Sequence, residues 1–117
     1  MPPNYNCFED EEKAGIEVLK LIRDNPVMIF SKTTCSFCVQ AKELLTGKEV
    51  PFHAVELDTC EDGEAMHKFL AERSCQETVP NIWISKCKIG GFDDLKKMAD
   101  DGSLKERLNT LEIRNTF

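Results

Sequence analysis

The sequence predicts an α/β protein in which helices cover both faces of a four-stranded mixed sheet. Short apolar runs rich in strand-forming residues alternate with segments whose apolar residues recur at helical spacing. Their order is helix, strand, helix, strand, helix, strand, strand, helix, which is typical of a three-layer sandwich. At 117 residues the chain can bury one core but is short for two domains. We therefore expect a single domain at 11–117, preceded by a flexible N-terminal arm at 1–10.

The first helix and the first strand are predicted on either side of Asn25-Pro26, a pair that stops a helix. Residues 11–24 carry acidic side chains in their first turn, where the helix dipole favours negative charge. The apolar stripe of this helix consists of Ile16, Leu19 and Ile22, with Val18 beside it. The unbroken apolar run at 27–31 predicts the strand, and residues 1–10 are assigned to the arm because they show no periodicity.

The middle of the chain predicts a second helix, a second strand and a third helix. The second helix follows the first strand and runs to about Gly47. Residues 51–57 alternate partly, with Phe52, Ala54 and Val55 inward, which predicts a strand. A strand, helix, strand unit implies a right-handed parallel crossover. The third helix is marked by Met66, Phe69, Leu70 and Arg73.

The C-terminal part predicts a hairpin followed by two helices. Residues 82–85 are expected to form the third strand, and 86–89 to pair with it through a tight turn. A helix is expected at 92–101, and Gly102-Ser103 separates it from a last helix. The core-facing stripe of that last helix consists of Leu104, Leu108 and Leu111.

Charge and composition narrow the functional class. The net charge of −6 repels phosphate backbones and argues against nucleic-acid binding. The longest apolar runs are far shorter than a membrane span. The N-terminus lacks the basic start and apolar run of a signal peptide, so we expect a cytoplasmic protein. In that compartment the six cysteines are expected to be reduced thiols and not a disulfide scaffold.

Two of these thiols, Cys35 and Cys38, lie where the strand at 27–31 gives way to a helix. The first backbone N–H groups of a helix have no helical partner, and the helix dipole adds partial positive charge. Both effects favour a thiolate at Cys35, and Lys32 adds a full positive charge nearby. A thiolate is the attacking species in disulfide exchange, so the sequence predicts a redox-active dithiol.

The same residues leave other interpretations open. Cys35 and Cys38 could form half of a zinc site, but the sequence has no second Cys-x-x-Cys or His-x-x-x-His pair. Lys32 could be an ordinary surface lysine, and Asp93-Asp94 could simply complement a helix dipole.

Most remaining cysteines and aromatic residues are assigned structural roles. Free cysteine often serves as a small buried hydrophobe, and we expect this of most of Cys60, Cys75 and Cys87, with Cys87 the most exposed. Cys7 lies on the arm and is expected to be an exposed thiol. Trp83 and Phe30 are expected in the core.

Three features besides the Cys-x-x-Cys dithiol make the sequence resemble a dithiol glutaredoxin, a member of the thioredoxin-like fold. They are Lys32 three positions before Cys35, the tripeptide Thr78-Val79-Pro80 before the third strand, and Gly90-Gly91-Phe92-Asp93-Asp94 at the start of the next helix. The resemblance runs from about residue 14 to residue 111. A thioredoxin is a poorer match, because the Trp that usually precedes its first active-site cysteine is missing.

The resemblance implies that Cys35 is the nucleophile, which carries the glutathione mixed disulfide, and that Cys38 is the resolving thiol. It implies a cis bond before Pro80, so that the backbone of Val79 meets the cysteine part of glutathione. Free N–H groups at the helix start and the Asp93 carboxylate would meet the γ-glutamyl end, and Lys32 the carboxylate at the glycine end. The expected glutathione-binding residues are Lys32, Phe37, His67, Thr78, Val79, Pro80, Gly91, Phe92, Asp93 and Asp94.

Four positions depart from the family's pattern. Ser36 replaces the usual proline of the motif, and Phe37 stands where tyrosine is common. His67 occupies a glutamine position on the third helix that helps to hold the tripeptide. Glu77 replaces a residue that is often basic, and its charge is expected to repel the glycine carboxylate of glutathione and weaken binding.

The expected function is glutathione-dependent thiol–disulfide oxidoreduction, in which glutathione mixed disulfides and protein disulfides are reduced. Glutathione is then the cosubstrate and the partners are glutathionylated or disulfide-containing proteins. No metal site, nucleic acid or membrane is expected, and we expect a monomer. The alternative is a dimer that holds a [2Fe–2S] cluster through the first cysteine and two glutathiones. Relatives in which a small residue replaces the motif proline bind such a cluster, and Ser36 fits that pattern.

Overall fold

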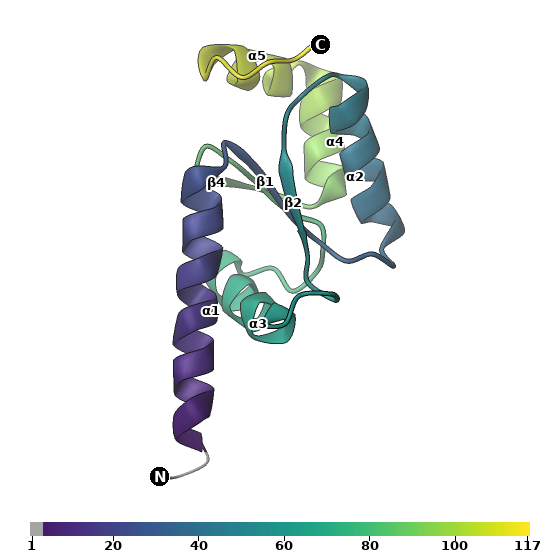
Figure 1. Ribbon diagram of the computed structural model, residues 1–117. Helices are drawn as coiled ribbons and strands as arrows, with labels where there is room; N and C mark the ends of the chain where they lie inside the picture. Colours follow the sequence, from purple (N-terminus) through teal and green to yellow (C-terminus); the bar gives the residue numbers. More distant parts are fainter. Residues whose placement is uncertain (1–3) are drawn as a thin grey trace.

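The computed structural model describes the backbone of residues 4–117 and the side chains of residues 11–117. At its centre is one four-stranded sheet (Figure 1). From one edge to the other its strands are β2 (His53–Glu56), β1 (Val27–Ser31), β3 (Asn81–Ile84) and β4 (Cys87–Gly90). β1 pairs in parallel with β2 and antiparallel with β3, and β4 pairs antiparallel with β3. The predicted mixed sheet and its parallel crossover are therefore confirmed.

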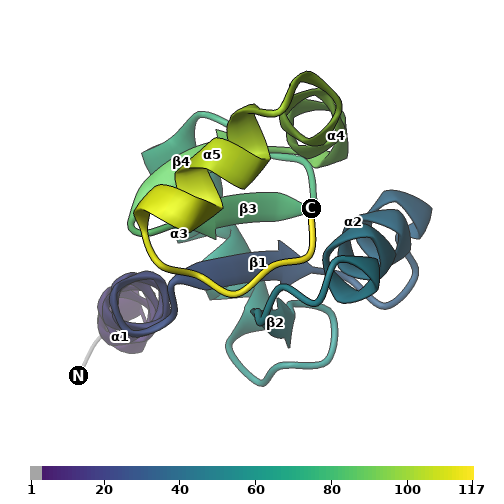
Figure 2. The same ribbon diagram turned by 90° about the horizontal axis from the view of Figure 1, so that it is seen from above.

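Five helices cover the two faces of the sheet (Figures 1 and 2). They are α1 (Asn4–Asp24), α2 (Ser36–Gly47), α3 (Gly63–Ser74), α4 (Phe92–Asp101) and α5 (Ser103–Thr110). The apolar side chains of α1 and α3 pack on one face, and those of α2, α4 and α5 pack on the other. Among the described residues, no helix has both the length and the apolar character that crossing a bilayer requires.

β1 supplies the centre of both core layers, because it is the strand whose five residues are all buried. Val27 and Ile29 point towards α2, α4 and α5, whereas Met28 and Phe30 point towards α1 and α3. The predicted core position of Phe30 is confirmed. Trp83 is half-buried against the second layer, and its indole N–H donates to the side chain of Asn81 at 2.7 Å.

α1 begins earlier than the sequence pattern predicts. Its helix starts at Asn4, so the expectation that residues 4–10 lack regular structure is wrong. The physical reason is that no proline follows Pro3 until Pro26, and prolines are tolerated ahead of a helix. Residues 1–3 and the side chain of Cys7 lie outside the described part of the chain. The division into an arm at 1–10 and a domain at 11–117 stays a prediction.

The buried face of α1 also differs from the predicted stripe. Ile16 is 62% exposed and Leu19 39%, whereas the buried residues at 11–24, the part of this helix with described side chains, are Ala14, Gly15, Val18 and Ile22. Small residues face α3 because the two helices approach closely there. A Cβ atom built on Gly15 would lie 2.7 Å from the ring of Phe69. The larger apolar residues of the predicted stripe are therefore partly displaced towards solvent.

Three smaller expectations also need correction. β2 begins only at His53, so Phe52 packs against the core from outside the strand. Leu111 is exposed, because α5 ends one residue before it. Cys60, Cys75 and Cys87 are all exposed, whereas exposure was expected mainly of Cys87. Each lies where the chain turns at the surface, since they are Cys60 in the loop before α3, Cys75 at the C-cap of α3 and Cys87 at the start of the edge strand β4.

Candidate active site

Cys35 and Cys38 occupy the predicted strand-to-helix turn. Cys35 is the N-cap residue of α2 and has an extended backbone, with φ −95° and ψ 114°. Its Sγ accepts a hydrogen bond from the backbone N–H of Cys38 at 3.3 Å. The side chain therefore takes the place that a serine or aspartate oxygen occupies in an ordinary N-cap.

The two thiols differ in their exposure to solvent. Cys35 is partly exposed, whereas Cys38 is fully buried on the face of α2 that packs on the sheet. Burial raises the pKa of the Cys38 thiol, and its contact with Cys35 raises this pKa further. The backbone of Lys32 and the hydroxyl of Ser31 act in the opposite direction and offset part of this increase in the pKa of Cys38. Cys38 is therefore held as a thiol beneath an accessible sulfur.

The tripeptide Thr78-Val79-Pro80 lies beside Cys35. The bond between Val79 and Pro80 is cis, as the family resemblance implies. The Cys35 thiol donates to the carbonyl oxygen of Val79 at 3.5 Å, across 44 positions of sequence. The backbone of Val79 thus forms one wall next to the accessible sulfur.

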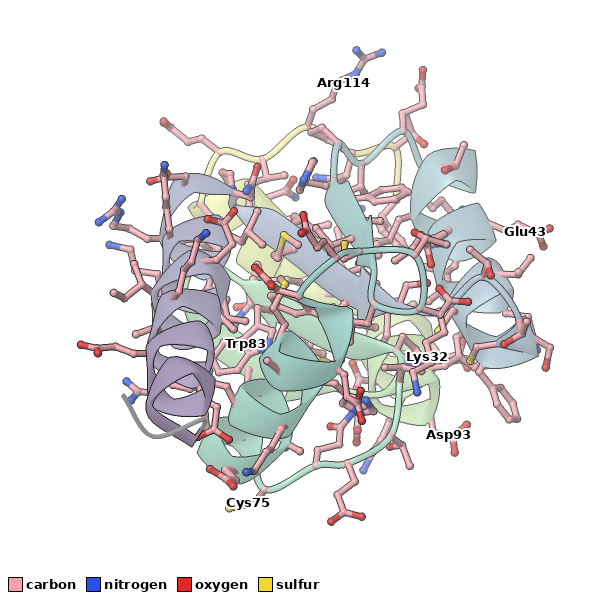
Figure 3. The ribbon with its side chains drawn as sticks, turned by 60° about the horizontal axis from the view of Figure 1, so that its bottom comes forward. Lys32, Glu43, Cys75, Trp83, Asp93 and Arg114 are labelled. Carbon is pink, nitrogen blue, oxygen red and sulfur yellow. The ribbon has the colours of Figure 1, made fainter. Side chains whose placement is uncertain are left out.

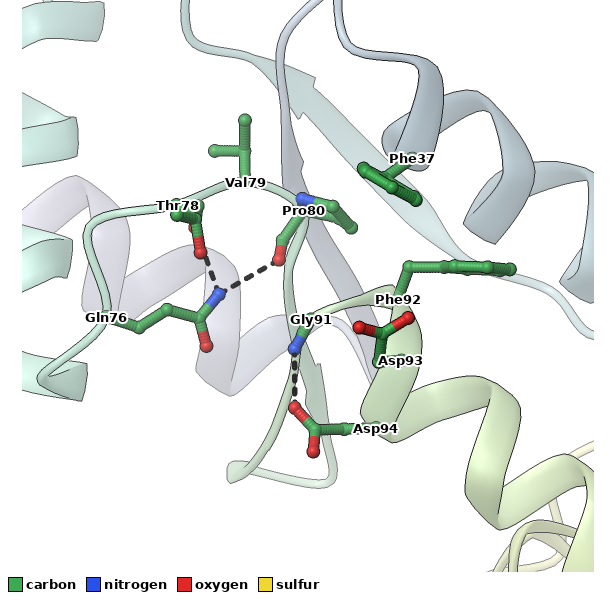
Figure 4. Close-up of a pocket in the computed structure, with 9 residues that line it drawn as sticks. All are labelled: Phe37, Gln76, Thr78, Val79, Pro80, Gly91, Phe92, Asp93 and Asp94. Carbon is green, nitrogen blue, oxygen red and sulfur yellow. Dashed lines mark hydrogen bonds between the residues drawn. The ribbon is translucent and has the colours of Figure 1, made fainter.

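A groove of about 460 Å³ extends from the tripeptide to the start of α4 (Figure 4). Its lining residues are Phe37, Gln76, Thr78, Val79, Pro80, Gly91, Phe92, Asp93 and Asp94. The rings of Phe37 and Phe92 stack across one side, with centroids 6.1 Å apart and planes 28° from parallel. The structure therefore gathers in one groove all of the predicted glutathione-binding residues except Lys32 and His67.

The two aspartates at the start of α4 have different tasks. Asp94 accepts a hydrogen bond from the backbone N–H of Gly91 at 3.0 Å, so it caps its own helix. Gly90 has a φ of +121°, and a Cβ atom there would lie 2.2 Å from the Asp94 carboxylate. Glycine is thus required next to this cap. Asp93 is exposed on the groove and makes no hydrogen bond to another described residue, so it is available to a ligand.

Lys32 and His67 lie next to the groove lining. Lys32 directly follows β1, at the entry to the dithiol turn (Figure 3). The Nε2 of His67 lies 2.7 Å from the carbonyl oxygen of Glu77, and it must carry the proton because a carbonyl can only accept. His67 thus fixes the backbone immediately before Thr78, which is the holding role expected for this position.

Two residues that fix the groove loops are not identified by the sequence pattern. The amide of Gln76 donates to the carbonyl oxygens of Thr78 and Pro80, both at 3.0 Å. Asp58 accepts from the backbone N–H of Thr33 at 3.1 Å and from its hydroxyl at 2.5 Å, and these bonds lower the pKa of the Asp58 carboxyl. The available signals were Asp58 directly after a predicted strand and a side-chain amide two positions before the tripeptide.

In the part of the chain with described side chains, no three His, Cys, Asp or Glu residues are grouped as metal ligands. Among these residues the zinc interpretation therefore has no ligands beyond Cys35 and Cys38.

Comparison with known proteins gives a consistent result. The glutaredoxin family model matches residues 27–87, which include the dithiol and the tripeptide. Glutaredoxin-1 of Rhizophagus irregularis is 44% identical over 94 residues, covering 80% of this chain and 93% of that protein. Glutaredoxin-2 of Schizosaccharomyces pombe is 41% identical over 100 residues, covering 86% and 89%. The crystal structure of a buckwheat glutaredoxin–glutathione complex superimposes with a TM-score of 0.87 at 32% identity, covering 91% of this chain and 96% of that one.

Proposed function

The chain belongs to the glutaredoxin family of thiol–disulfide oxidoreductases, and from this premise we propose that it reduces glutathione mixed disulfides and protein disulfides with glutathione as cosubstrate. The observation that carries the proposal is the position of Cys35. Its sulfur lies at the start of α2 and touches the backbone of Val79, next to a groove of about 460 Å³. The buckwheat relative with the same fold is described as a glutathione complex.

The proposed catalytic cycle uses the two thiols in turn. The Cys35 thiolate attacks the glutathionyl sulfur of a mixed disulfide, so a new disulfide forms to Cys35 and the substrate leaves as a thiolate that takes up a proton. A second glutathione thiolate then attacks the glutathionyl sulfur, which releases oxidised glutathione and returns the Cys35 thiolate. With a protein disulfide, Cys38 attacks Cys35 instead, and glutathione reduces the resulting Cys35–Cys38 bridge.

The groove provides complementary groups for the three parts of glutathione. The backbone of Val79 lies next to Cys35 and would bind the central cysteine residue. The N-terminus of α4 would bind the γ-glutamyl carboxylate, and the exposed Asp93 its ammonium group. Lys32 would meet the glycine carboxylate, while Phe37 and Phe92 cover the apolar side.

Two variants test the assignment of the two thiols. Cys35→Ser is expected to abolish turnover of a glutathionylated small disulfide, because it removes the nucleophile. Cys38→Ser is expected to keep that turnover but lose the reduction of protein disulfides, because it removes only the resolving thiol. Steady-state turnover with each substrate measures both effects. An inactive Cys38→Ser and an active Cys35→Ser would reverse the two roles.

The cluster-binding alternative is not favoured over oxidoreductase activity by any of the comparisons. Ser36 at the second motif position is the feature that is compatible with it. Anaerobic reconstitution with iron, sulfide and glutathione separates the two functions, because a cluster gives a brown protein whose colour is lost in Cys35→Ser. The oxidoreductase proposal predicts a colourless product.

A cytoplasmic location and a monomeric state complete the proposal. Three exposed and unpaired thiols, Cys60, Cys75 and Cys87, support a reducing compartment, where such thiols persist. Fluorescence imaging of the tagged full chain tests the location, and light scattering under reducing conditions tests the monomer.

A further inference from the structure

The loop that carries the tripeptide has two ends that are hydrogen-bonded to each other. It begins after Ser74, the last residue of α3, and it ends before Asn81, the first residue of β3. The side-chain amide of Asn81 donates to the Oγ atom of Ser74 at 3.0 Å. Asn81 is fully buried and Ser74 is 7% exposed, so water has little access to this bond. Residues 75–80 therefore leave and rejoin the rest of the protein at two points that hold each other.

Further hydrogen bonds fix both members of this pair. The Ser74 hydroxyl donates to the carbonyl oxygen of Leu70, one helical turn earlier, at 2.7 Å. The ammonium group of Lys88 on β4 donates to the Ser74 carbonyl oxygen, also at 2.7 Å. This carbonyl is one of those that a helix end leaves without a helical partner. The indole N–H of Trp83 donates to Asn81 Oδ1, and because an indole can only donate, the amide nitrogen of Asn81 must face Ser74.

The loop closed by this bond forms one wall of the groove. Four of its residues line the groove, namely Gln76, Thr78, Val79 and Pro80 (Figure 4). The two hydrogen bonds of Gln76 run to carbonyl oxygens of the same loop, so they fix its shape. The position of the loop relative to Cys35 depends instead on how the loop is anchored to α3 and β3. That position matters, because the Val79 carbonyl oxygen lies 3.5 Å from the Cys35 sulfur.

A buried amide at the start of β3 is costly unless its polar groups are paired. An apolar side chain of similar size would fill the same space without that cost. What the paired amide adds is direction, because a satisfied buried hydrogen-bond network holds its neighbours in one arrangement. Packing alone therefore gives no reason for an asparagine at position 81.

We propose that Asn81 is a positioning residue for the reaction with glutathione, because its bond to Ser74 holds the loop where the backbone of Val79 meets the glutathione on Cys35. The inference rests on the proposed function. Asn81 does not line the groove, and it lies on the face of the sheet that carries α1 and α3, like its register partner Phe30. It therefore acts through the loop. Without the bond the loop samples other arrangements, and the apparent affinity for glutathione falls with the fraction that stays competent.

The proposal is tested by comparing two disulfides that react at Cys35. The parent protein and all variants carry Cys38→Ser, so that the adduct on Cys35 persists. Reduced protein is mixed with glutathione disulfide or with dithiodipyridine, an aromatic disulfide that contains no glutathione. Both reagents are kept below saturation. The reaction is quenched with acid at successive times, and mass spectrometry of the proteolytic peptides measures the adduct on Cys35 separately from those on other thiols.

Two variants remove the bond between the loop ends from its two sides. Asn81→Ala and Ser74→Ala are each expected to slow adduct formation with glutathione disulfide by roughly 5-fold, the loss typical of one hydrogen bond. The rate with dithiodipyridine should be unchanged, because this reagent does not need the backbone of Val79. The double variant S74A/N81A should lose no more than either single variant, since all three lack the same bond.

Trp83→Phe is the matched control. It removes the other hydrogen bond of Asn81 and leaves the bond to Ser74, so both rates should equal those of the parent protein. Equal slowing with the two disulfides, no slowing with either, additive losses in the double variant, or a selective loss in Trp83→Phe would overturn the proposal. A parent protein that reacts with dithiodipyridine but forms no glutathione adduct on Cys35 would instead contradict the proposed function.

Discussion

The two ends of the layer formed by α2, α4 and α5 are stabilised in different ways (Figure 1). At the groove end, loops are fixed by a few hydrogen bonds from side chains, which join Thr33 to Asp58, Gln76 to Thr78 and Pro80, His67 to Glu77, and Gly91 to Asp94. At the opposite end, α5 is fixed by the fully buried Leu104 and Leu108. The groove must stay open to ligands, so apolar side chains cannot fill it. The difference implies that ligand affinity and global stability are largely separable in this molecule.

The largest expected effect is on stability, at the apolar end. Leu108→Ala should lower the free energy of unfolding by about 2–5 kcal/mol, because it leaves a cavity between α5 and the sheet. KM for glutathione should stay unchanged in the folded protein. Urea denaturation and steady-state kinetics measure the two quantities. Leu111→Ala, at an exposed position, is the control and should change stability by less than about 0.5 kcal/mol.

The second-largest expected effect is on the affinity for glutathione and comes from a change at the groove end. Gln76→Ala removes two hydrogen bonds to the tripeptide and leaves the carbonyl oxygens of Thr78 and Pro80 without these donors. We expect KM for glutathione to rise by about 10-fold, which corresponds to about 1.4 kcal/mol. Gln40→Ala, on the exposed side of α2, should leave KM unchanged. A large loss of stability without a change in KM would contradict the separation between the two ends.

A third test uses pH at the contact between Asp58 and Thr33. Hydrogen bonds from Thr33 lower the pKa of the Asp58 carboxyl in the folded protein. The contribution of this contact to stability is therefore present above the unfolded-state pKa of about 3.9 and is lost as pH falls through the lower folded-state pKa. Asp58→Asn should be less stable than the unmodified protein at pH 7, and the difference should fade below about pH 4. Urea denaturation at both pH values measures it, and a difference independent of pH would exclude the carboxylate as its source.

The smallest effect is expected at Glu77, which is exposed beside the tripeptide. Glu77→Lys should lower KM for glutathione about twofold, because it replaces repulsion of the glycine carboxylate with attraction across solvent. The effect should disappear at high salt. Glu106→Lys changes the charge equally on α5, at the other end of the molecule, and should leave KM unaltered.

Strong periodic patterns and the dithiol motif were sufficient to predict most of the fold. The apolar run of β1 and the helical spacing of α2 placed Cys35 correctly, because both elements bury one continuous surface. On α1, Val18 and Ile22 are buried as predicted, but Ile16 and Leu19 are not. A close helix contact selects small residues such as Ala14 and Gly15 and not the largest apolar ones. The spacing of apolar residues along the sequence carries no information about how closely two helices approach each other.

The motif residues that line the groove were predicted from the sequence, but the side chains that hold them in position were not. Asp58 and Gln76 act through hydrogen bonds between a side chain and the backbone of a different loop. Such bonds depend on how two loops approach each other in space, which residue spacing does not determine.

The contact between Gly15 and Phe69 has a consequence for how this chain can vary. An alanine at position 15 would place its methyl carbon 2.7 Å from the aromatic ring, so the ring must move or shrink for the substitution to be accepted. The two positions should therefore change together. In a library randomised at both sites and selected for folding, we expect a small residue at 15 to accompany an aromatic residue at 69, and larger residues at 15 to survive only where 69 has become smaller.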